Sequence, residues 1–442
     1  MRRRAKMHLA VNLFLLLLAA AGLLIIFFPT LASSLPFTAN FTANSVDSPM
    51  PVASESSTSA LPATAPSATT SPVPSSEPSP EPIATQEAIV PPPSPSNSYQ
   101  EALWVAVGDI MMHSPELPGA YNKKTKSYNF DPFFQDVEPI LKEGDWVLAN
   151  LETPVAGSAF AYTGYPTFNA PVALLDALQN AGFNILTNAN NHMLDKGEKG
   201  LLLTLKHMKE KDFIIKGSAA TQKEADTNII VKKNGIRMGL LAYTYGTNGI
   251  AIPKGKSYMV PLIDEQKMIA DIKKLKKAGA DFVTVALHFG TEYQTKPNEE
   301  QKTLARKLIA EGADIIAGSH THVIQPYEVL EATDEKGRER QGLIIYSMGN
   351  FISNQRGDTK DYGVIYQVLI RKNNGDGSIQ LADIKAIPTW VYRYKPDQYY
   401  RYRILPVEQT LAEQSSKLLT PDLYATLKKN LSLLRTRLES MS

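Results

Sequence analysis

The sequence predicts an α/β fold with layered sheets. From residue 101 onward, short apolar runs alternate with longer stretches in which apolar residues recur at helical spacing. This order of strand, helix and strand is typical of α/β domains. The apolar runs also end in polar residues, and ligands of α/β folds gather at the carboxyl ends of strands.

The apolar runs give seven expected strands, at 103–109, 145–152, 183–189, 237–244, 282–290, 313–320 and 342–350. The stretches between them give four expected helices, at 170–182, 200–212, 264–281 and 298–314.

The first 32 residues have the composition of a membrane anchor. Residues 1–8 carry four basic side chains, and residues 9–32 are almost wholly apolar. About 20 apolar residues can cross a bilayer as a helix, and the basic flank predicts a cytoplasmic N-terminus. We therefore expect a single-pass protein of the cell membrane whose C-terminal domain is extracellular. Cleavage of a signal peptide near Ala32 is the alternative and would give a soluble secreted form.

The remaining boundaries follow from changes in composition. Residues 33–98 are rich in Ser, Pro, Ala and Thr and contain no Lys or Arg. Such a segment cannot bury enough apolar surface to fold, so we interpret it as a disordered, extended linker. The folded domain is expected at 99–405, followed by a helical segment at 406–442 that is broken near 420–422.

Composition excludes several classes of site. Cysteine is absent, which excludes disulfides and thiolate metal sites. An extracellular protein without disulfides needs a core that is stable alone. The 46 basic and 44 acidic residues nearly balance, so charge gives no case for nucleic-acid binding.

Polar residues follow the apolar runs one after another. They are Asp109 with His113, Asn150 with Glu152, Asn190 with Asn191 and His192, His288, His320 with His322, and Asn350. We expect these side chains to converge at one edge of the sheets, although they are far apart in sequence.

This set offers carboxylate, amide and imidazole donors without sulfur, which suits Mn, Fe or Zn better than Mg. His320 and His322 are two residues apart, so in an extended segment both rings would point the same way. We expect one or two divalent ions. Two ions about 4 Å apart that share a carboxylate would clamp an oxyanion and activate a water.

The stretch NANNHMLD (188–195) has two expected roles. Asn191 would bind the metal through its amide oxygen. His192 would face the substrate and protonate a leaving oxygen, because histidine titrates near neutral pH. Asp195 would orient the imidazole of His192.

Each motif also has an ordinary structural explanation when it is taken alone. Asp109 follows Gly108 as in many turns, and Glu152 would serve as a cap. His288 would be a hydrogen-bonded core histidine, and His113 a loop residue.

Six motifs carry a resemblance to a known family: VGDIMMH, NLETPV, NANNHMLDKG, ALHFGTEY, GSHTHVIQP and YSMGNFI. In this order they resemble the bacterial capsule-synthesis protein CapA family, which includes the poly-γ-glutamate capsule proteins of Gram-positive bacteria. The motif order is also similar to that of the calcineurin-like metallophosphoesterases. The resemblance covers about residues 101–355 and implies a four-layer αββα sandwich with a metal centre at the strand ends.

The resemblance also implies roles for individual residues. The metal-ligand motifs fall on Asp109, Glu152, Asn191, His288, His320 and His322, and the catalytic histidine of the phosphoesterases falls on His192. We expect supporting roles around these ligands for His113, Asn150, Asn190, Glu292 and Asn350, with Glu292 as a partner that orients His288.

Two departures from the phosphoesterase pattern bear on a second metal and on phosphatase activity. His113 lies four places after Asp109 rather than two, and Glu152 stands where phosphoesterases have a bridging aspartate.

Together with the expected membrane anchor, the resemblance implies a membrane-anchored extracellular protein that acts in the synthesis or export of a poly-γ-glutamate capsule. An anionic polymer and a membrane synthase or exporter are the expected partners. An enzyme of this kind would carry out metal-assisted hydrolysis or transfer at a phosphoester or amide. An extracellular metal-dependent phosphoesterase and a non-catalytic polymer-binding scaffold stay open as alternatives.

One further stretch, TWVYRYKPDQYYRYR (389–403), interleaves aromatic and basic residues. Charge and stacking would let it hold an acidic polymer through Arg393, Lys395, Arg401 and Arg403. We favour the alternative, an edge strand with ordinary cross-strand tyrosines.

Overall fold

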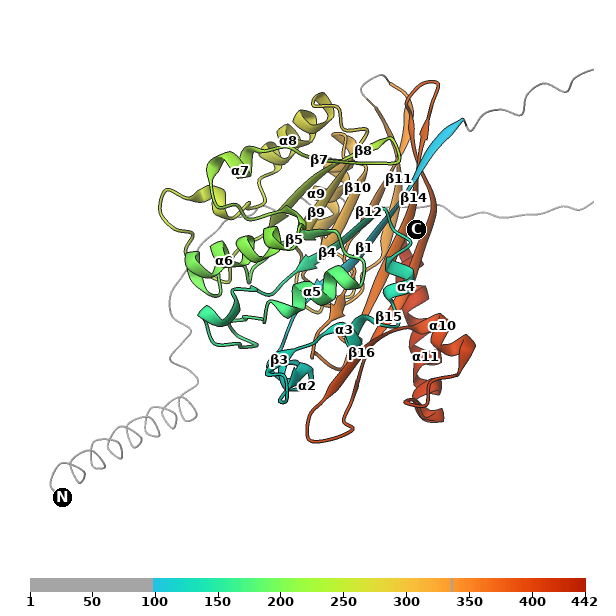
Figure 1. Cartoon of the computed structure of the whole chain (residues 1–442). Helices are drawn as coiled ribbons and strands as arrows, with labels where there is room; N and C mark the ends of the chain where they lie inside the picture. The colour runs from blue at the N-terminus through green and yellow to red at the C-terminus, as the bar shows by residue number, and fades with distance from the viewer. Residues whose placement is uncertain (1–97, 335–336) are drawn as a thin grey trace, which may run out of the picture. The chain divides into compact units, whose positions relative to one another are not determined.

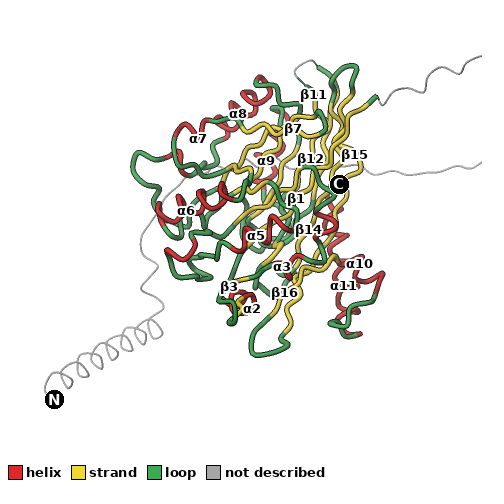
Figure 2. The backbone as a smooth tube through the Cα atoms, viewed as in Figure 1, coloured by secondary structure: helices red, strands yellow, loops and turns green. Residues whose placement is uncertain are grey.

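Two large β-sheets pack face to face in the computed structural model, which describes residues 98–334 and 337–442 (Figures 1 and 2). The first sheet has the order β16-β15-β14-β1-β4-β5-β6, with β13 paired to β1. Its strands are β1 (Tyr99–Ile110), β4 (Trp146–Leu151), β5 (Ile185–Thr187), β6 (Ile214–Lys216), β13 (Asn350–Ile352), β14 (Tyr362–Asn373), β15 (Ile379–Tyr394) and β16 (Arg401–Pro406).

The second sheet has the order β11-β12-β10-β9-β8-β7. Its strands are β7 (Ile229–Lys233), β8 (Ile236–Thr244), β9 (Phe282–His288), β10 (Ile315–Ser319), β11 (Tyr327–Thr333) and β12 (Glu339–Ile345). Strands β1, β4, β5 and β6 of the first sheet run parallel to one another, and so do β8, β9, β10 and β12 of the second. Their carboxyl ends therefore lie at a common edge within each sheet.

Helices cover the outer faces of the two sheets. The main ones are α5 (Ala173–Asn180), α6 (Gly197–Glu210), α8 (Glu265–Lys277) and α9 (Glu299–Ala310), while α10 (Val407–Glu413) and α11 (Pro421–Leu438) close the chain. Short elements fill the connections: α2 (Leu117–Ala120), α3 (Asp131–Phe134), α4 (Glu138–Leu141), α7 (Gln222–Asp226), and the hairpin of β2 (Tyr121–Asn122) and β3 (Ser127–Tyr128).

Three apolar clusters define the layers. Neighbouring residues of β1 show the division: Val105 packs with α5 in one cluster, whereas Trp104 packs with Phe282 of the second sheet in another. The third cluster joins the far face of the second sheet to α8 and α9. Because successive side chains of a strand point to opposite faces, a strand covered on both sides reads as a continuous apolar run. The fold is the expected four-layer αββα sandwich.

The long antiparallel strand β14 has no counterpart among the expected elements and extends the first sheet. The strands that follow it, β15 and β16, overlap the edge strand that we favour for residues 389–403. Within residues 98–334 and 337–442, no helix combines the length and apolarity that a membrane crossing requires. The expected anchor at 9–32 and nearly all of the expected linker at 33–98 lie outside the described residues.

Candidate metal centre

Two carboxylates at neighbouring strand ends form the floor of the candidate site. Asp109 is the last residue but one of β1 and Glu152 directly follows β4, and both are fully buried. Across the gap between the sheets, His322 Nδ1 lies 3.2 Å from Asp109 Oδ2 and His288 Nε2 lies 3.3 Å from Glu152 Oε1. The strand ends of both sheets therefore contribute to one polar cluster.

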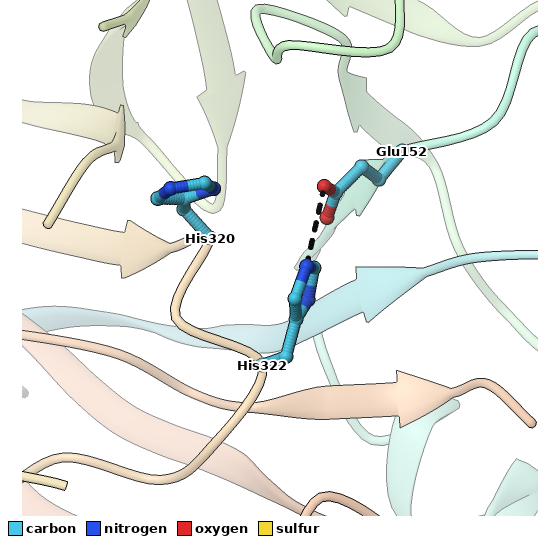
Figure 3. Close-up of side chains that lie close together, drawn as sticks. All are labelled: Glu152, His320 and His322. Carbon is cyan, nitrogen blue, oxygen red and sulfur yellow. Dashed lines mark ion pairs between the residues drawn. The ribbon is translucent and has the colours of Figure 1, made fainter. Parts of the chain in front are cut away.

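The two histidines that follow β10 have a backbone conformation that the sequence did not predict. His320 and His322 have φ values of 93° and 57°, in the left-handed region. The backbone is therefore not extended here, and the expectation of an extended segment is wrong. Residues other than glycine adopt a left-handed backbone conformation only at a cost in free energy. Figure 3 shows both rings on one tight loop, with His322 directed at Glu152.

Glu152 stands between two sets of donor atoms. Glu152, His320 and His322 form one set whose ligand atoms all lie within 4.8 Å of one another, and Asp109, Glu152 and His288 form a second set of the same kind. Since both sets contain Glu152, the geometry fits one ion or two neighbouring ions that share this carboxylate.

Several donor atoms of this cluster have no hydrogen-bond partner in the protein. Both carboxylate oxygens of Glu152 and Nδ1 of His320 are buried and have no hydrogen-bond partner. Buried polar atoms normally have partners, and in the described residues no Lys or Arg forms an ion pair with Asp109 or Glu152. Oxygen and imidazole donors in this arrangement fit a divalent transition metal.

Burial and like charge shift the pKa values of these groups. Burial, and then the charge of Asp109, raise the pKa of Glu152 well above its usual 4.5. Burial and the neighbouring histidines hold the pKa of His288 well below 6.5 and that of His320 at about 3. His288 and His320 therefore stay neutral at physiological pH, as metal ligands must be.

Two asparagines hold the carboxylates in place. Asn150 Nδ2 donates to Asp109 Oδ1 at 2.8 Å and lies 3.2 Å from His288 Nδ1. Asn190 Nδ2 donates to Asn150 Oδ1 (3.2 Å) and to the carbonyl of Leu151 (2.8 Å). These contacts fix the strand ends that carry Asp109 and Glu152.

The stretch after β5 supplies an amide oxygen and an oriented imidazole. Asn191 Oδ1 lies 2.9 Å from His288 Nε2, so the amide oxygen faces the cluster. His192 Nδ1 lies 2.9 Å from Asp195 Oδ2, and the same oxygen accepts the backbone N–H of Phe168 at 2.7 Å. The ring of Phe168 meets the ring of His192 edge to face, 4.7 Å away. The imidazole is thus held at one nitrogen and packed at one face.

Two residues that we expect to support the ligands, His113 and Asn350, differ in how near they lie to the donor sets. His113 contacts Glu116, the backbone N–H of Asn354 and the ring of Phe168, outside the donor sets. Asn350 donates to the carbonyl of His322 at 3.3 Å, while its own Oδ1 is buried without a partner.

Glu292 does not fit the role of orienting His288. Its side chain is exposed. Both ring nitrogens of His288 contact other groups, with Nδ1 against Asn150 and Ser319 and Nε2 against Asn191 and Glu152. Ser319, the last residue of β10, lies 2.9 Å from Nδ1 and takes the position that we had expected for Glu292.

Two tyrosines beside the centre were also missed by the sequence reasoning. The ring of Tyr245 lies 4.4 Å from that of His320, and the ring of Tyr293 lies 6.0 Å from that of His322. Burial, followed by Glu292, raises the pKa of each tyrosine to about 12. Tyr245 directly follows β8, so the rule that sites form at strand ends would have found it; Tyr293 carries no comparable signal.

The aromatic and basic stretch forms the β15–β16 hairpin at the edge of the first sheet. Arg401 pairs with Asp397 and Arg403 with Asp136, which neutralises two of the four basic residues. Arg393 and Lys395 pair with no carboxylate in the described residues and lie over the ring of Tyr400. The edge-strand interpretation therefore accounts for Arg401 and Arg403, but not for Arg393 and Lys395.

A four-layer sandwich with a cluster of metal-type donors at its strand ends defines a protein with a metallophosphatase-like fold. Among solved structures, the chain is similar to the calcineurin-like phosphoesterase YfkN from Bacillus subtilis. The identity is 16%, the match covers 65% of this chain and 90% of that chain, and the TM-score is 0.39. It is also similar to the NAD nucleotidase of Haemophilus influenzae. The identity is 14%, the match covers 78% of this chain and 57% of that chain, and the TM-score is 0.40.

The sequence comparison is more specific. The profile described as bacterial capsule synthesis protein PGA_cap matches residues 104–355, and the chain belongs to this family. It is 33% identical to the capsule biosynthesis protein CapA of Bacillus anthracis over 299 residues, which cover 65% of this chain and 68% of the relative. It is 34% identical to the PGA biosynthesis protein CapA of Bacillus subtilis over 288 residues, which cover 63% of this chain and 70% of the relative.

Proposed function

We propose that this protein acts in the synthesis of an extracellular capsule polymer, poly-γ-glutamate, and that it does so through a divalent metal centre. The family and the names of the two Bacillus relatives support the polymer. The apolar residues 9–32 would hold the domain at the outer face of the cell membrane. A membrane synthase or exporter would be its partner.

The observation that carries the metal proposal is the state of Glu152. A carboxylate that is fully buried, without any hydrogen bond and beside a second carboxylate, is costly unless a cation neutralises it. The residues that would hold the metal are Asp109, Glu152, Asn191, His288, His320 and His322. Mn, Fe or Zn suits this mixture of oxygen and imidazole donors.

The chemistry divides between the metal and His192. When bound, a divalent ion supplies positive charge that stabilises an oxyanion at the scissile bond. Asp195 holds Nδ1 of His192, so Nε2 is the atom that would deliver a proton to the leaving group. The edge-to-face contact with Phe168 keeps the imidazole at that angle. This arrangement supports hydrolysis or transfer at an amide or phosphoester bond.

A matched pair of histidine variants tests this proposal. His207 lies on α6, where its Nδ1 contacts the carbonyl of Val155, outside the donor sets. His192→Ala and His207→Ala each remove one imidazole, so only the first should affect catalysis. We would express each variant in a strain that lacks this gene, measure capsule, and assay cleavage of γ-glutamate oligomers and of a phosphodiester.

We expect His192→Ala to lose capsule and to slow turnover by roughly 10²- to 10⁴-fold, while His207→Ala matches the wild type. Full complementation by His192→Ala would contradict catalysis and favour the non-catalytic scaffold. Turnover of the phosphodiester alone, without any effect on capsule, would favour an extracellular phosphoesterase.

A further inference from the structure

The pattern of ion pairs singles out three arginines. The described residues contain eleven arginines, and eight of them pair with a carboxylate: Arg237, Arg306, Arg338, Arg340, Arg371, Arg401, Arg403 and Arg435. Arg356, Arg393 and Arg437 pair with none. Arg437 donates to Thr359 and to a backbone carbonyl. Arg356 lies over the ring of Tyr402, and Arg393 shares the acceptor Asn354 Oδ1 with the hydroxyl of Tyr402.

Arg393 is held in a fixed position without neutralisation of its charge. Its Nη1 donates to Asn354 Oδ1 at 2.9 Å, and the hydroxyl of Tyr402 donates to the same oxygen at 2.7 Å. Its guanidinium carbon lies 4.4 Å from the ring centroid of Tyr400. The Nζ of Lys395 lies 5.4 Å from that same centroid. A fixed, half-buried guanidinium beside a second cation is an arrangement that an anion would stabilise.

Arg356 extends the positive charge inward. Its guanidinium carbon lies 5.7 Å from the ring centroid of Tyr402, and its Nη2 is buried without a hydrogen-bond partner. Burial lowers the pKa of Arg356, and Arg393 acts in the same direction. Asp361 and Glu116 raise it, but neither carboxylate forms an ion pair with the guanidinium.

The loop that carries Arg356 joins these cations to the candidate metal centre. Gln355 accepts a hydrogen bond from Asn350 Nδ2 at 3.0 Å, and Asn350 also donates to the carbonyl of His322. On the other side, the backbone N–H of Asn354 donates to His113 Nδ1 at 3.3 Å. The edge-to-face ring contacts of Phe168 then link His113 to His192. Loop 353–356 therefore contacts the metal side of the site and the arginine pair at once.

We propose that Arg356 and Arg393, with Lys395 beyond them, form a subsite that binds a carboxylate of an acidic polymer while another part of the same chain occupies the metal centre. This inference rests on the proposed function. Poly-γ-glutamate carries one free carboxylate per residue, so a chain that leaves the centre presents an acid at each step. A planar guanidinium fork binds a carboxylate through two parallel N–H···O bonds.

Charge-conserving and charge-removing variants of the full-length protein test the subsite. Arg393→Gln removes the proposed contact, and Arg393→Lys keeps the charge but loses the planar fork. Arg401→Gln is the matched control, since it removes the same charge from the same hairpin at a residue that Asp397 already neutralises. Affinity for a γ-glutamate oligomer would be measured with the metal chelated, alongside an oligomer of glycerol phosphate and a thermal unfolding curve for each variant.

We expect Arg393→Gln to weaken binding of the γ-glutamate oligomer by about 10- to 100-fold, the range for loss of a charged hydrogen bond. Arg393→Lys should lie between the wild type and Arg393→Gln, and Arg401→Gln should stay within about twofold of the wild type. Arg356→Gln should weaken binding in the same direction as Arg393→Gln.

Three other outcomes would overturn the subsite in different ways. Wild-type affinity in a folded Arg393→Gln protein would refute the subsite but leave the proposed function intact. Absence of γ-glutamate binding by the wild type would refute the polymer of the proposed function and the subsite with it. Tighter, Arg393-dependent binding of the glycerol phosphate oligomer would refute the choice of carboxylate.

Discussion

The two ends of the parallel strands both carry acidic side chains, but these acids have different partners. At the amino ends, Asp281 precedes β9 and Asp314 precedes β10. Asp314 is buried and pairs with Lys276 (2.7 Å) and Arg340 (3.4 Å), and Asp281 pairs with Arg237 and Lys372. At the carboxyl ends, the basic side chains within ion-pair distance of Asp109 and Glu152 are, in the described residues, histidines alone.

The difference teaches how to separate a structural acid from a ligand. Although burial acts to raise the pKa of Asp281, hydrogen bonds from Arg237 and Lys372 bring it below the usual 3.8. The pKa of Glu152 is instead raised, because no fixed cation offsets its burial and the charge of Asp109. An acid paired with Lys or Arg has its charge compensated within the fold, whereas a buried acid whose basic neighbours are imidazoles alone has the surroundings expected of a metal ligand.

The largest expected effect lies at the amino ends. Asp314→Asn would leave Lys276 and Arg340 without their charge partner in a buried position, and we expect it to lower the free energy of unfolding by about 3 to 5 kcal/mol. Urea unfolding of the metal-free protein at neutral pH measures this change. A loss below about 1 kcal/mol would mean that the pair is screened like a surface salt bridge.

In metal-free protein, Glu152→Gln should change the free energy of unfolding in the opposite direction to Asp314→Asn. It removes a buried, unpaired carboxylic group beside Asp109, so we expect the free energy of unfolding at neutral pH to rise by about 1 to 3 kcal/mol. The same variant should weaken metal binding. If Glu152→Gln destabilised the metal-free protein as much as Asp314→Asn does, the acids at the amino and carboxyl ends of the strands would not differ in how they contribute to stability.

The smallest effect concerns pH and His320. Its folded-state pKa of about 3 lies below the 6.5 of the unfolded chain, so the stability that it contributes is present above pH 6.5 and is lost as the pH falls toward 3. Metal-free protein should lose about 1 kcal/mol through this group between pH 6.5 and 5.5.

The Glu152→Gln background is the right one for this titration, because protonation of Glu152 acts in the opposite direction. Since the pKa of Glu152 is raised above 4.5, the stability that it contributes is present at low pH and is lost as the pH rises. In that background, His320→Asn should flatten the pH dependence. If His320→Asn left the pH dependence of the free energy of unfolding unchanged, His320 would already be protonated or exposed to solvent in the metal-free state.

The parts of the site that could be predicted are those that depend on local sequence. Asp109, Asn150 and His288 stand at the ends of apolar runs, and the carboxyl ends of parallel strands lie at one edge whatever the details of packing. The alternation of runs and helical stretches likewise predicted the α/β class. The four layers came from the motif resemblance, because apolar runs alone do not say how many sheets form.

The parts that could not be predicted depend on contacts between distant segments. Arg403 looks free in the sequence, yet its partner Asp136 lies 267 residues away along the chain. The role expected for Glu292 failed because the turn after β9 leaves its side chain exposed, while Ser319 from the next strand reaches the imidazole of His288. Spacing along the chain carries no information about either arrangement.

The most direct test of the account is the metal content of the purified full-length protein and of its His320→Ala/His322→Ala double variant, with His207→Ala as the control. We predict about one or two Mn, Fe or Zn ions per wild-type chain and per His207→Ala chain, and a loss of most of that metal in the folded double variant. A folded wild-type protein that binds none of these ions after reconstitution would contradict the central claim, and the buried cluster around Glu152 would then serve the fold alone.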